Sequence, residues 1–182
     1  MSWLFAALLL LALAASVWLF NGLVHARNLC ASAWADIDVQ LQRRHDLVPR
    51  LVKVVKAAAS HERETLAAVV ESRDLAVRAG KVADKGEREE ALGEAISRLV
   101  LLVEDYPDLK AGDSFLELNE DLVDIEDKLQ YARRFYNGAT REYNNRVQRF
   151  PDQLIAGSFG FKLADYFQAE ADARTAATVD LS

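Results

Sequence analysis

The sequence predicts an all-α protein in which an N-terminal transmembrane helix is followed by an antiparallel, up-and-down four-helix bundle. The chain of 182 residues contains only three prolines and eight glycines, too few for an all-β protein. Its stretch 3–20 has no charged residue. Beyond that stretch, apolar residues recur at alternating steps of three and four, the spacing of amphipathic helices.

Residues 1–24 are predicted to form the membrane anchor. Eighteen helical residues, 3–20, span about 27 Å, close to the thickness of a bilayer core. Trp3 and Trp18 lie near the two ends of this stretch, where aromatic side chains favour the membrane–water interfaces.

A cleaved signal peptide is the alternative interpretation, because Ala12-Leu13-Ala14 has the small residues of a cleavage site. However, no Lys or Arg precedes the apolar run, and the run continues beyond these residues. Lipid attachment at Cys30 is disfavoured because Arg27-Asn28-Leu29 precedes it instead of small residues. We therefore expect the anchor to be retained.

The orientation prediction rests on basic residues. The N-terminal flank has none, whereas Arg27, Arg43 and Arg44 follow the span. The positive-inside rule then places the bundle in the cytoplasm and the N-terminus outside.

The first two helices of the bundle are predicted on either side of Pro49. Apolar positions continue from the anchor through Trp34 and Leu41, so the first helix should run into the bundle and end in a turn near 43–46. A second helix, 47–79, would then begin with Pro49 in its first turn. The alternative is one very long helix that is kinked at Pro49.

Two further helices follow a charged loop at 80–86. The helix 87–105 ends before Pro107. The helix 113–149 has the clearest periodicity and begins with a capping box formed by Ser114 and Glu117.

The bundle is assigned to residues 25–149, and its fourth helix should return toward the bilayer. Segment 150–168 would then either cap the bundle core or touch lipid. The aromatic side chains available for such contacts are Phe150, Phe159, Phe161, Tyr166 and Phe167. Residues 169–182 have no apolar stripe and are expected to be a disordered tail.

Charged residues beside the apolar stripes are candidates for ion pairs between helices. Arg44 continues the first stripe, and Glu126 and Arg133 flank the stripe of 113–149. We expect a carboxylate of the 113–149 helix to pair with Arg44.

Five stretches of the chain resemble the LemA family of bacterial membrane-anchored proteins. They are AWADIDVQLQRRHDLVPRLV (33–52), HERETL (61–66), VEDYPDLKAGDSF (103–115), DIEDKLQYARRFYN (124–137) and FPDQLIAGSFGF (150–161). The resemblance implies one N-terminal transmembrane helix, a four-helix bundle and a location in the bacterial inner membrane. It supplies no activity and no catalytic residue. Gly112-Asp113-Ser114 and Asn119 depart mildly from the family pattern.

Motifs that would indicate an enzyme are incomplete in this sequence. His61-Glu62 begins like a zinc-peptidase helix, but Thr65 replaces the second histidine. No histidine has a glutamate three residues before it, as a di-iron bundle requires. Ser158 lacks the strand and first glycine of a nucleophile elbow. We expect no catalytic residue, no metal and no cofactor.

Charge and cysteine content argue against nucleic-acid binding, an intramolecular disulfide and a metal site. The net charge of −6 disfavours nucleic acid, and one cysteine cannot form an intramolecular disulfide. The acidic run 117–127 is typical of a solvated helix face rather than a metal site.

We therefore expect a non-enzymatic membrane scaffold or adaptor that binds the lipid bilayer and a protein partner or a second copy of itself, with no small-molecule substrate. The alternative is a lipid-binding or membrane-shaping protein that uses the C-terminal aromatic segment. A hydrolase that depends on Ser158 or His61 is a third, minor interpretation.

Overall fold

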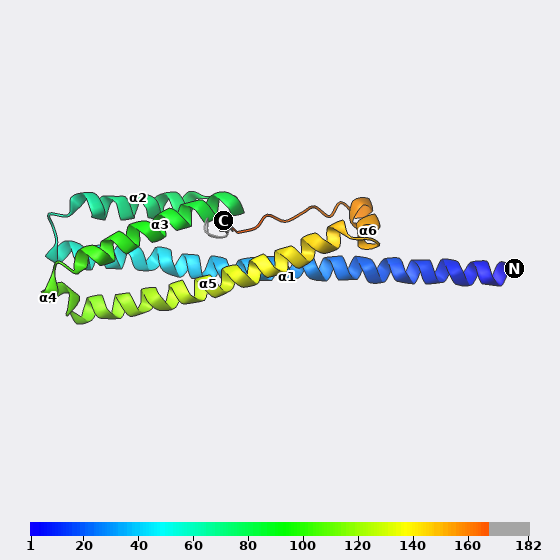
Figure 1. The fold of residues 1–182 in the computed structure, drawn as a ribbon, viewed down its shortest axis with the longest axis horizontal. Helices are drawn as coiled ribbons and strands as arrows, with labels where there is room; N and C mark the ends of the chain where they lie inside the picture. The colour runs from blue at the N-terminus through cyan, green and yellow to red at the C-terminus, as the bar shows by residue number, and fades with distance from the viewer. Residues whose placement is uncertain (168–182) are drawn as a thin grey trace, which may run out of the picture. The chain divides into compact units, whose positions relative to one another are not determined.

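A computed structural model describes residues 1–167 of the chain, and the regular structure in this range is helical, with no strand (Figure 1). The helices are α1 (Ser2–Ala58), α2 (Arg63–Arg78), α3 (Val82–Val103), α4 (Pro107–Lys110), α5 (Asp113–Gln148) and α6 (Asp152–Phe159). The expected all-α class is confirmed. The expected tail at 169–182 lies outside the described residues.

The helices form two compact units. Among the described residues, the first unit comprises Met1–Val39 and Gln130–Asp165, and the second comprises Gln40–Leu129 together with Tyr166 and Phe167. Helices α1 and α5 each contribute a segment to both units.

The predicted turn near 43–46 is wrong, because α1 continues through it to Ala58, and the alternative of one very long helix holds. Pro49 lies inside α1 and has no N–H to donate to the carbonyl of His45, four residues earlier. The Arg73 side chain of α2 supplies the missing donor, with Nε 3.1 Å from the His45 carbonyl oxygen. A contact from another helix therefore lets the proline remain within α1.

Other predicted boundaries also need correction. The predicted helix 47–79 is divided by a break between Ala58 and Arg63, and the predicted loop 80–86 largely belongs to α3, which begins at Val82. The helix predicted at 113–149 is confirmed as α5.

In the first unit, α1 and α5 pack along a coiled-coil-like seam. Buried residues of α1 recur at steps of three and four, and so do those of α5, as in a heptad repeat. The α1 residues are Leu23, Ala26, Cys30, Ala33 and Ile37, and the α5 residues are Ala132, Tyr136, Ala139 and Tyr143. Trp34, which was assigned to this seam from the sequence, is half-buried beside it, with its ring centroid 5.4 Å from that of Tyr136.

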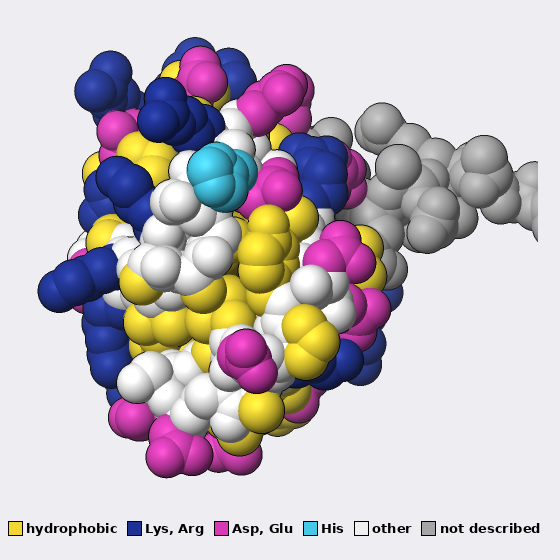
Figure 2. All heavy atoms as spheres, turned by 90° about the vertical axis from the view of Figure 1, so that its left-hand side faces the viewer, with side chains coloured by type: hydrophobic (Ala, Val, Ile, Leu, Met, Phe, Trp, Pro, Cys, Tyr) yellow, Lys and Arg dark blue, Asp and Glu magenta, His cyan; other side chains and the backbone are white. Residues whose placement is uncertain are grey.

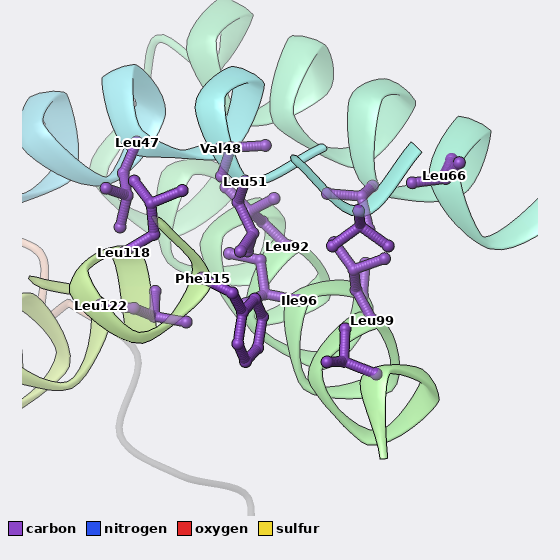
Figure 3. Close-up of a cluster of buried hydrophobic side chains, with 14 of the residues drawn as sticks. Leu47, Val48, Leu51, Leu66, Leu92, Ile96, Leu99, Phe115, Leu118 and Leu122 are labelled. Carbon is purple, nitrogen blue, oxygen red and sulfur yellow. The ribbon is translucent and has the colours of Figure 1, made fainter. Parts of the chain in front are cut away.

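The second unit has a core to which four long helices contribute. Leu47 of α1 lies beside Leu118 of α5, and Leu51 of α1 points toward Ile96 of α3 and Phe115 of α5 (Figure 3). Within this unit α2 and α3 lie side by side as a helical hairpin (Figure 1).

The first turns of α1 lack protein contacts. Residues 1–15 are exposed on all sides, and Leu23 is the first fully buried side chain. The hydroxyl of Ser16 donates to the Ala12 carbonyl oxygen at 2.8 Å, so this polar group is satisfied within the helix. The stretch is long and apolar enough to cross a membrane.

Candidate functional site

Aromatic side chains meet at the end of the apolar stretch of α1. The Phe20 ring lies 4.9 Å from the Phe159 ring and 5.7 Å from the Phe161 ring, measured between centroids, in edge-to-face geometry. The Arg27 guanidinium carbon lies 5.3 Å from the Phe161 centroid, within cation–π range. These contacts fix the end of α6 beside α1 within the first unit.

Gly160 turns the chain after α6. Its φ of 71° lies in the left-handed region, where a side chain would be strained. The Phe161 N–H donates to the Ala156 carbonyl oxygen at 3.0 Å, closing the helix in the manner of a Schellman motif. This turn directs Phe161 back onto α1.

An extended strap, residues 161–165, follows and is clasped by α5. The Tyr143 hydroxyl donates to the Lys162 carbonyl oxygen at 2.8 Å, and the Tyr136 hydroxyl donates to the Asp165 carbonyl oxygen at 2.8 Å. The Asn144 side chain donates to and accepts from the backbone of Ala164, both at 2.9 Å. Four hydrogen bonds therefore hold an otherwise irregular segment.

Large apolar side chains are exposed on α6 and just before it. Phe150, Leu154 and Phe159 are 78%, 63% and 64% exposed. The Ser158 hydroxyl on the same helix donates to the Leu154 carbonyl oxygen at 2.9 Å. Of the other predicted membrane-proximal aromatics, Tyr166 is exposed and Phe167 is buried.

Charge is distributed unevenly between the units. The first unit has seven Lys and Arg against five Asp and Glu, whereas residues 40–129 have fourteen against twenty. Arg27 and Lys162 are exposed beside Phe161, and no carboxylate pairs with either among residues 1–167. Arg149 pairs with the buried Asp152 at 3.0 Å. The aromatic cluster therefore has a cationic flank.

A buried ionic cluster lies in the second unit. The Arg44 guanidinium contacts Glu89 of α3, with Nη1 3.3 Å from its carbonyl oxygen and 3.5 Å from Oε2, and Arg44 Nε lies 3.0 Å from Glu126 Oε1 of α5. This last N–H is not aligned with the oxygen, so the contact is an ion pair rather than a hydrogen bond. His45 Nε2 lies 2.6 Å from Glu89 Oε1.

Burial defines the role of this cluster. Arg44, His45 and Glu89 are 1%, 4% and 0% exposed, so each depends on its partners for the interactions that water would otherwise provide. A Cβ atom at Gly93 would lie 2.7 Å from Arg44 Nη2, so the glycine makes room for the guanidinium. Arg133, a further predicted ion-pair residue, is half-buried in the first unit and interacts there with its surroundings.

Burial also changes the acidity of several groups. It raises the pKa of the Cys30 thiol above its ordinary value of 9.0, although the nearby polar side chain of Thr140 opposes the effect in part. Burial likewise raises the pKa values of the Tyr136 and Tyr143 hydroxyls above 10.0. All three groups therefore remain protonated at neutral pH.

A surface groove of about 920 Å³ lies between the end of α1 and α2. Its apolar floor includes Val52, Leu66 and Val70, and Lys, Arg, Glu and Asp side chains form its rim. No histidine or cysteine lines the groove in the described part of the chain. Within residues 1–167, no group of three or more His, Cys, Asp or Glu is placed to hold a metal ion.

Sequence reasoning paired Arg44 with a carboxylate of α5 but did not identify Glu89, His45 or Arg73. Glu89 was not identified because residues 80–86, just before it, are predicted as a charged loop and not as part of its helix. Arg73 could have been sought, since a proline inside a helix leaves the carbonyl four residues earlier without its donor.

These features define an all-helical protein with an exposed apolar N-terminal helix, an aromatic and cationic cluster beside it, and a buried ionic cluster in its second unit. The sequence profile of the LemA family matches residues 33–181. The chain therefore belongs to the LemA family.

The chain is also similar to three magnetosome proteins. It is 29% identical over 160 residues to magnetosome proteins MamQ 1 and MamQ 2 of Paramagnetospirillum magneticum, an alignment that covers 74% of this chain and 59% of each relative. Magnetosome protein MamQ of Magnetospirillum gryphiswaldense is 26% identical over 174 residues, covering 81% of this chain and 64% of the relative. The chain thus spans about six-tenths of the length of these relatives.

Proposed function

We propose that this protein is a non-enzymatic scaffold or adaptor, anchored in the bacterial inner membrane by the start of α1 and built as an antiparallel up-and-down four-helix bundle. One observation carries the proposal: α1 supplies both the exposed apolar stretch and side chains of both cores without interruption. A continuous helix connects the anchor to the bundle without a flexible linker.

Surface composition supports a protein partner or a second copy as the ligand of this scaffold. On the side of the second unit where α4 lies, apolar side chains gather at the centre and charged side chains surround them (Figure 2). An apolar centre with a polar rim is typical of protein–protein interfaces. Large apolar side chains such as Leu101 and Tyr131 are also exposed, at 64% and 74%.

Position-specific crosslinking in the membrane tests this proposal. A photoreactive amino acid is placed at Leu101 or Tyr131 of the full chain, and at exposed Glu90 as a control. We expect one product of reproducible mass from at least one apolar position and none from the control. A chain that is monomeric in mild detergent and gives no position-dependent product would refute the scaffold.

Orientation is a separate part of the proposal. The bundle is placed in the cytoplasm and the N-terminus outside, because Arg27, Arg43 and Arg44 follow the span. A C-terminal reporter that is active only in the cytoplasm should be active, and a reporter active only outside should be silent. The opposite pattern would reverse the assignment without affecting the scaffold.

A lipid-binding or membrane-shaping role is the second candidate. The exposed apolar side chains Phe150, Leu154 and Phe159, which lie in and next to α6, favour it. Exposing them together to water is unfavourable unless another surface covers them. Under this role the bilayer itself, rather than a protein, is what the C-terminal segment binds.

A further inference from the structure

We propose that α6 and its cationic flank form a binding surface for anionic lipid headgroups. This surface belongs to the same bilayer that holds α1, so the inference rests on the proposed membrane anchoring. It adds the class of lipid and the residues that select it.

The position of α6 along α1 is the first step. Phe20 is the last residue of the apolar run 3–20, before Asn21, and its ring contacts Phe159 at the end of α6. If residues 3–20 cross the hydrocarbon core, Phe20 lies at the interface, and α6 must lie at the same depth. The aromatic contact therefore brings a segment more than 130 residues away in sequence to the bilayer surface.

The composition of α6 suits that depth. Leu154 and Phe159 of α6, and Phe150 just before it, are large apolar side chains with most of their surface exposed, and Gly157 has no side chain. The Ser158 hydroxyl is already bonded within the helix, so its removal from water carries little penalty. Exposed apolar side chains of this kind insert into the boundary between headgroups and acyl chains.

The flanking charge determines which headgroups bind. Arg27 of α1 lies over the ring of Phe161, and Lys162 follows Phe161 in the strap; both side chains are exposed. Neither pairs with a carboxylate in the described part of the chain, although the whole protein has an excess of acidic residues. Two cations at the level of the headgroups attract anionic lipids in preference to zwitterionic ones.

The strap makes the surface rigid before lipid binds. Tyr143 and Asn144 hold the backbone on both sides of Leu163, and the turn at Gly160 fixes the direction of approach. Lys162 is therefore presented from a fixed backbone rather than from a loose chain end. Such preorganisation lowers the entropic cost of binding.

The test uses the full chain with Cys30→Ala and Leu154→Cys, labelled with an environment-sensitive fluorophore. Two vesicle preparations contain phosphatidylcholine and phosphatidylglycerol in the same ratio. In one the phosphatidylcholine has brominated acyl chains that quench the label, and in the other the phosphatidylglycerol has them. We expect quenching by both lipids, with a preference for brominated phosphatidylglycerol of roughly five-fold for each cation. The same label at Leu10 reports whether the anchor is in the bilayer.

Charge variants identify the selecting residues. The variant R27Q/K162Q should remain quenched but lose the preference, and K162Q alone, which keeps the Arg27 contact with Phe161, should lose about half of it on a logarithmic scale. The control R50Q/K53Q removes one Arg and one Lys from exposed positions of the second unit and should keep the full preference.

The possible failures are distinguishable. If the label at Leu10 is quenched but the label at Leu154 is not, the lipid surface is refuted and the anchor stands. Equal quenching of the Leu154 label by the two lipids refutes the selection of anionic headgroups. If neither label is quenched, the membrane anchoring itself is refuted.

Discussion

The contact between Arg73 and the carbonyl of His45 gives a quantitative prediction about how a proline is tolerated inside α1. The Nε donor lies 3.1 Å from the carbonyl oxygen, and the Arg73 side chain is 28% exposed. Hydrogen bonds that involve a charged group contribute about 1.5–3 kcal/mol, and partial access of water places this one near the lower end. Arg73→Ala, which also removes the surface pair with Asp74, should therefore destabilise the protein by about 2 kcal/mol.

The same substitution should have a smaller effect when residue 49 is alanine. Pro49→Ala restores an N–H that reaches the His45 carbonyl within the helix, so Arg73 is no longer required as the donor. In this background Arg73→Ala removes mainly the surface pair with Asp74, which contributes about 0.5 kcal/mol. The double-mutant cycle should thus show a coupling of about 1.5 kcal/mol, and Pro49→Ala alone should be stabilising.

Urea unfolding in detergent, followed by far-ultraviolet circular dichroism, measures the four free energies. Arg78→Ala, at an exposed position on the same helix, is the control and should change stability by less than about 0.5 kcal/mol. If the effects of Arg73→Ala and Pro49→Ala are additive within about 0.4 kcal/mol, the arginine does not compensate for the proline.

Three further predictions follow from buried groups. Glu89→Ala leaves Arg44 and His45 without a buried partner and should destabilise the chain by about 3 kcal/mol in the same urea assay, whereas exposed Glu90→Ala should have almost no effect; equal effects would contradict the cluster. The raised pKa of Tyr143 contributes stability below pH 10.0 that is lost as pH rises through the folded-state pKa. Tyr143→Phe should therefore be less stable at neutral pH by about 1 kcal/mol, but its stability should decline less at alkaline pH. Parallel pH profiles of stability for the two proteins would argue against this. Alkylation of Cys30 by N-ethylmaleimide should be slow in the native protein and fast in urea, and a native rate near that of a free thiol would show that the seam is open.

The all-α class and the long helix α5 could be predicted from sequence because apolar periodicity is a local signal. The seam of α5 is visible in the order of its residues, and Gly112 and Pro151 bracket the helix. The pairing of Arg44 with α5 could be anticipated for the same reason, since a charge in line with an apolar stripe must meet a partner across it.

The continuity of α1 could not be predicted because it depends on a contact from another helix. Locally, Asp46 and Pro49 have the pattern of a helix start, and only the donor from Arg73 makes a continuous helix acceptable. The hydrogen bonds from α5 to the strap, residues 161–165, are similarly nonlocal. Tyr143 and Asn144 look like ordinary members of an amphipathic helix until residues 162–164 are placed beside them.

The central claim is that α1 passes from the bilayer into the water-facing units as one helix. Nitroxide labels placed one at a time along α1 in the Cys30→Ala chain, reconstituted in vesicles, measure depth from the ratio of collisions with oxygen and with an aqueous nickel complex. The account predicts the greatest depth near Leu10, a steady decrease toward Phe20, and full aqueous access at exposed Ser32 and Asp36. Equal aqueous access at Leu10 and Ser32 would contradict it.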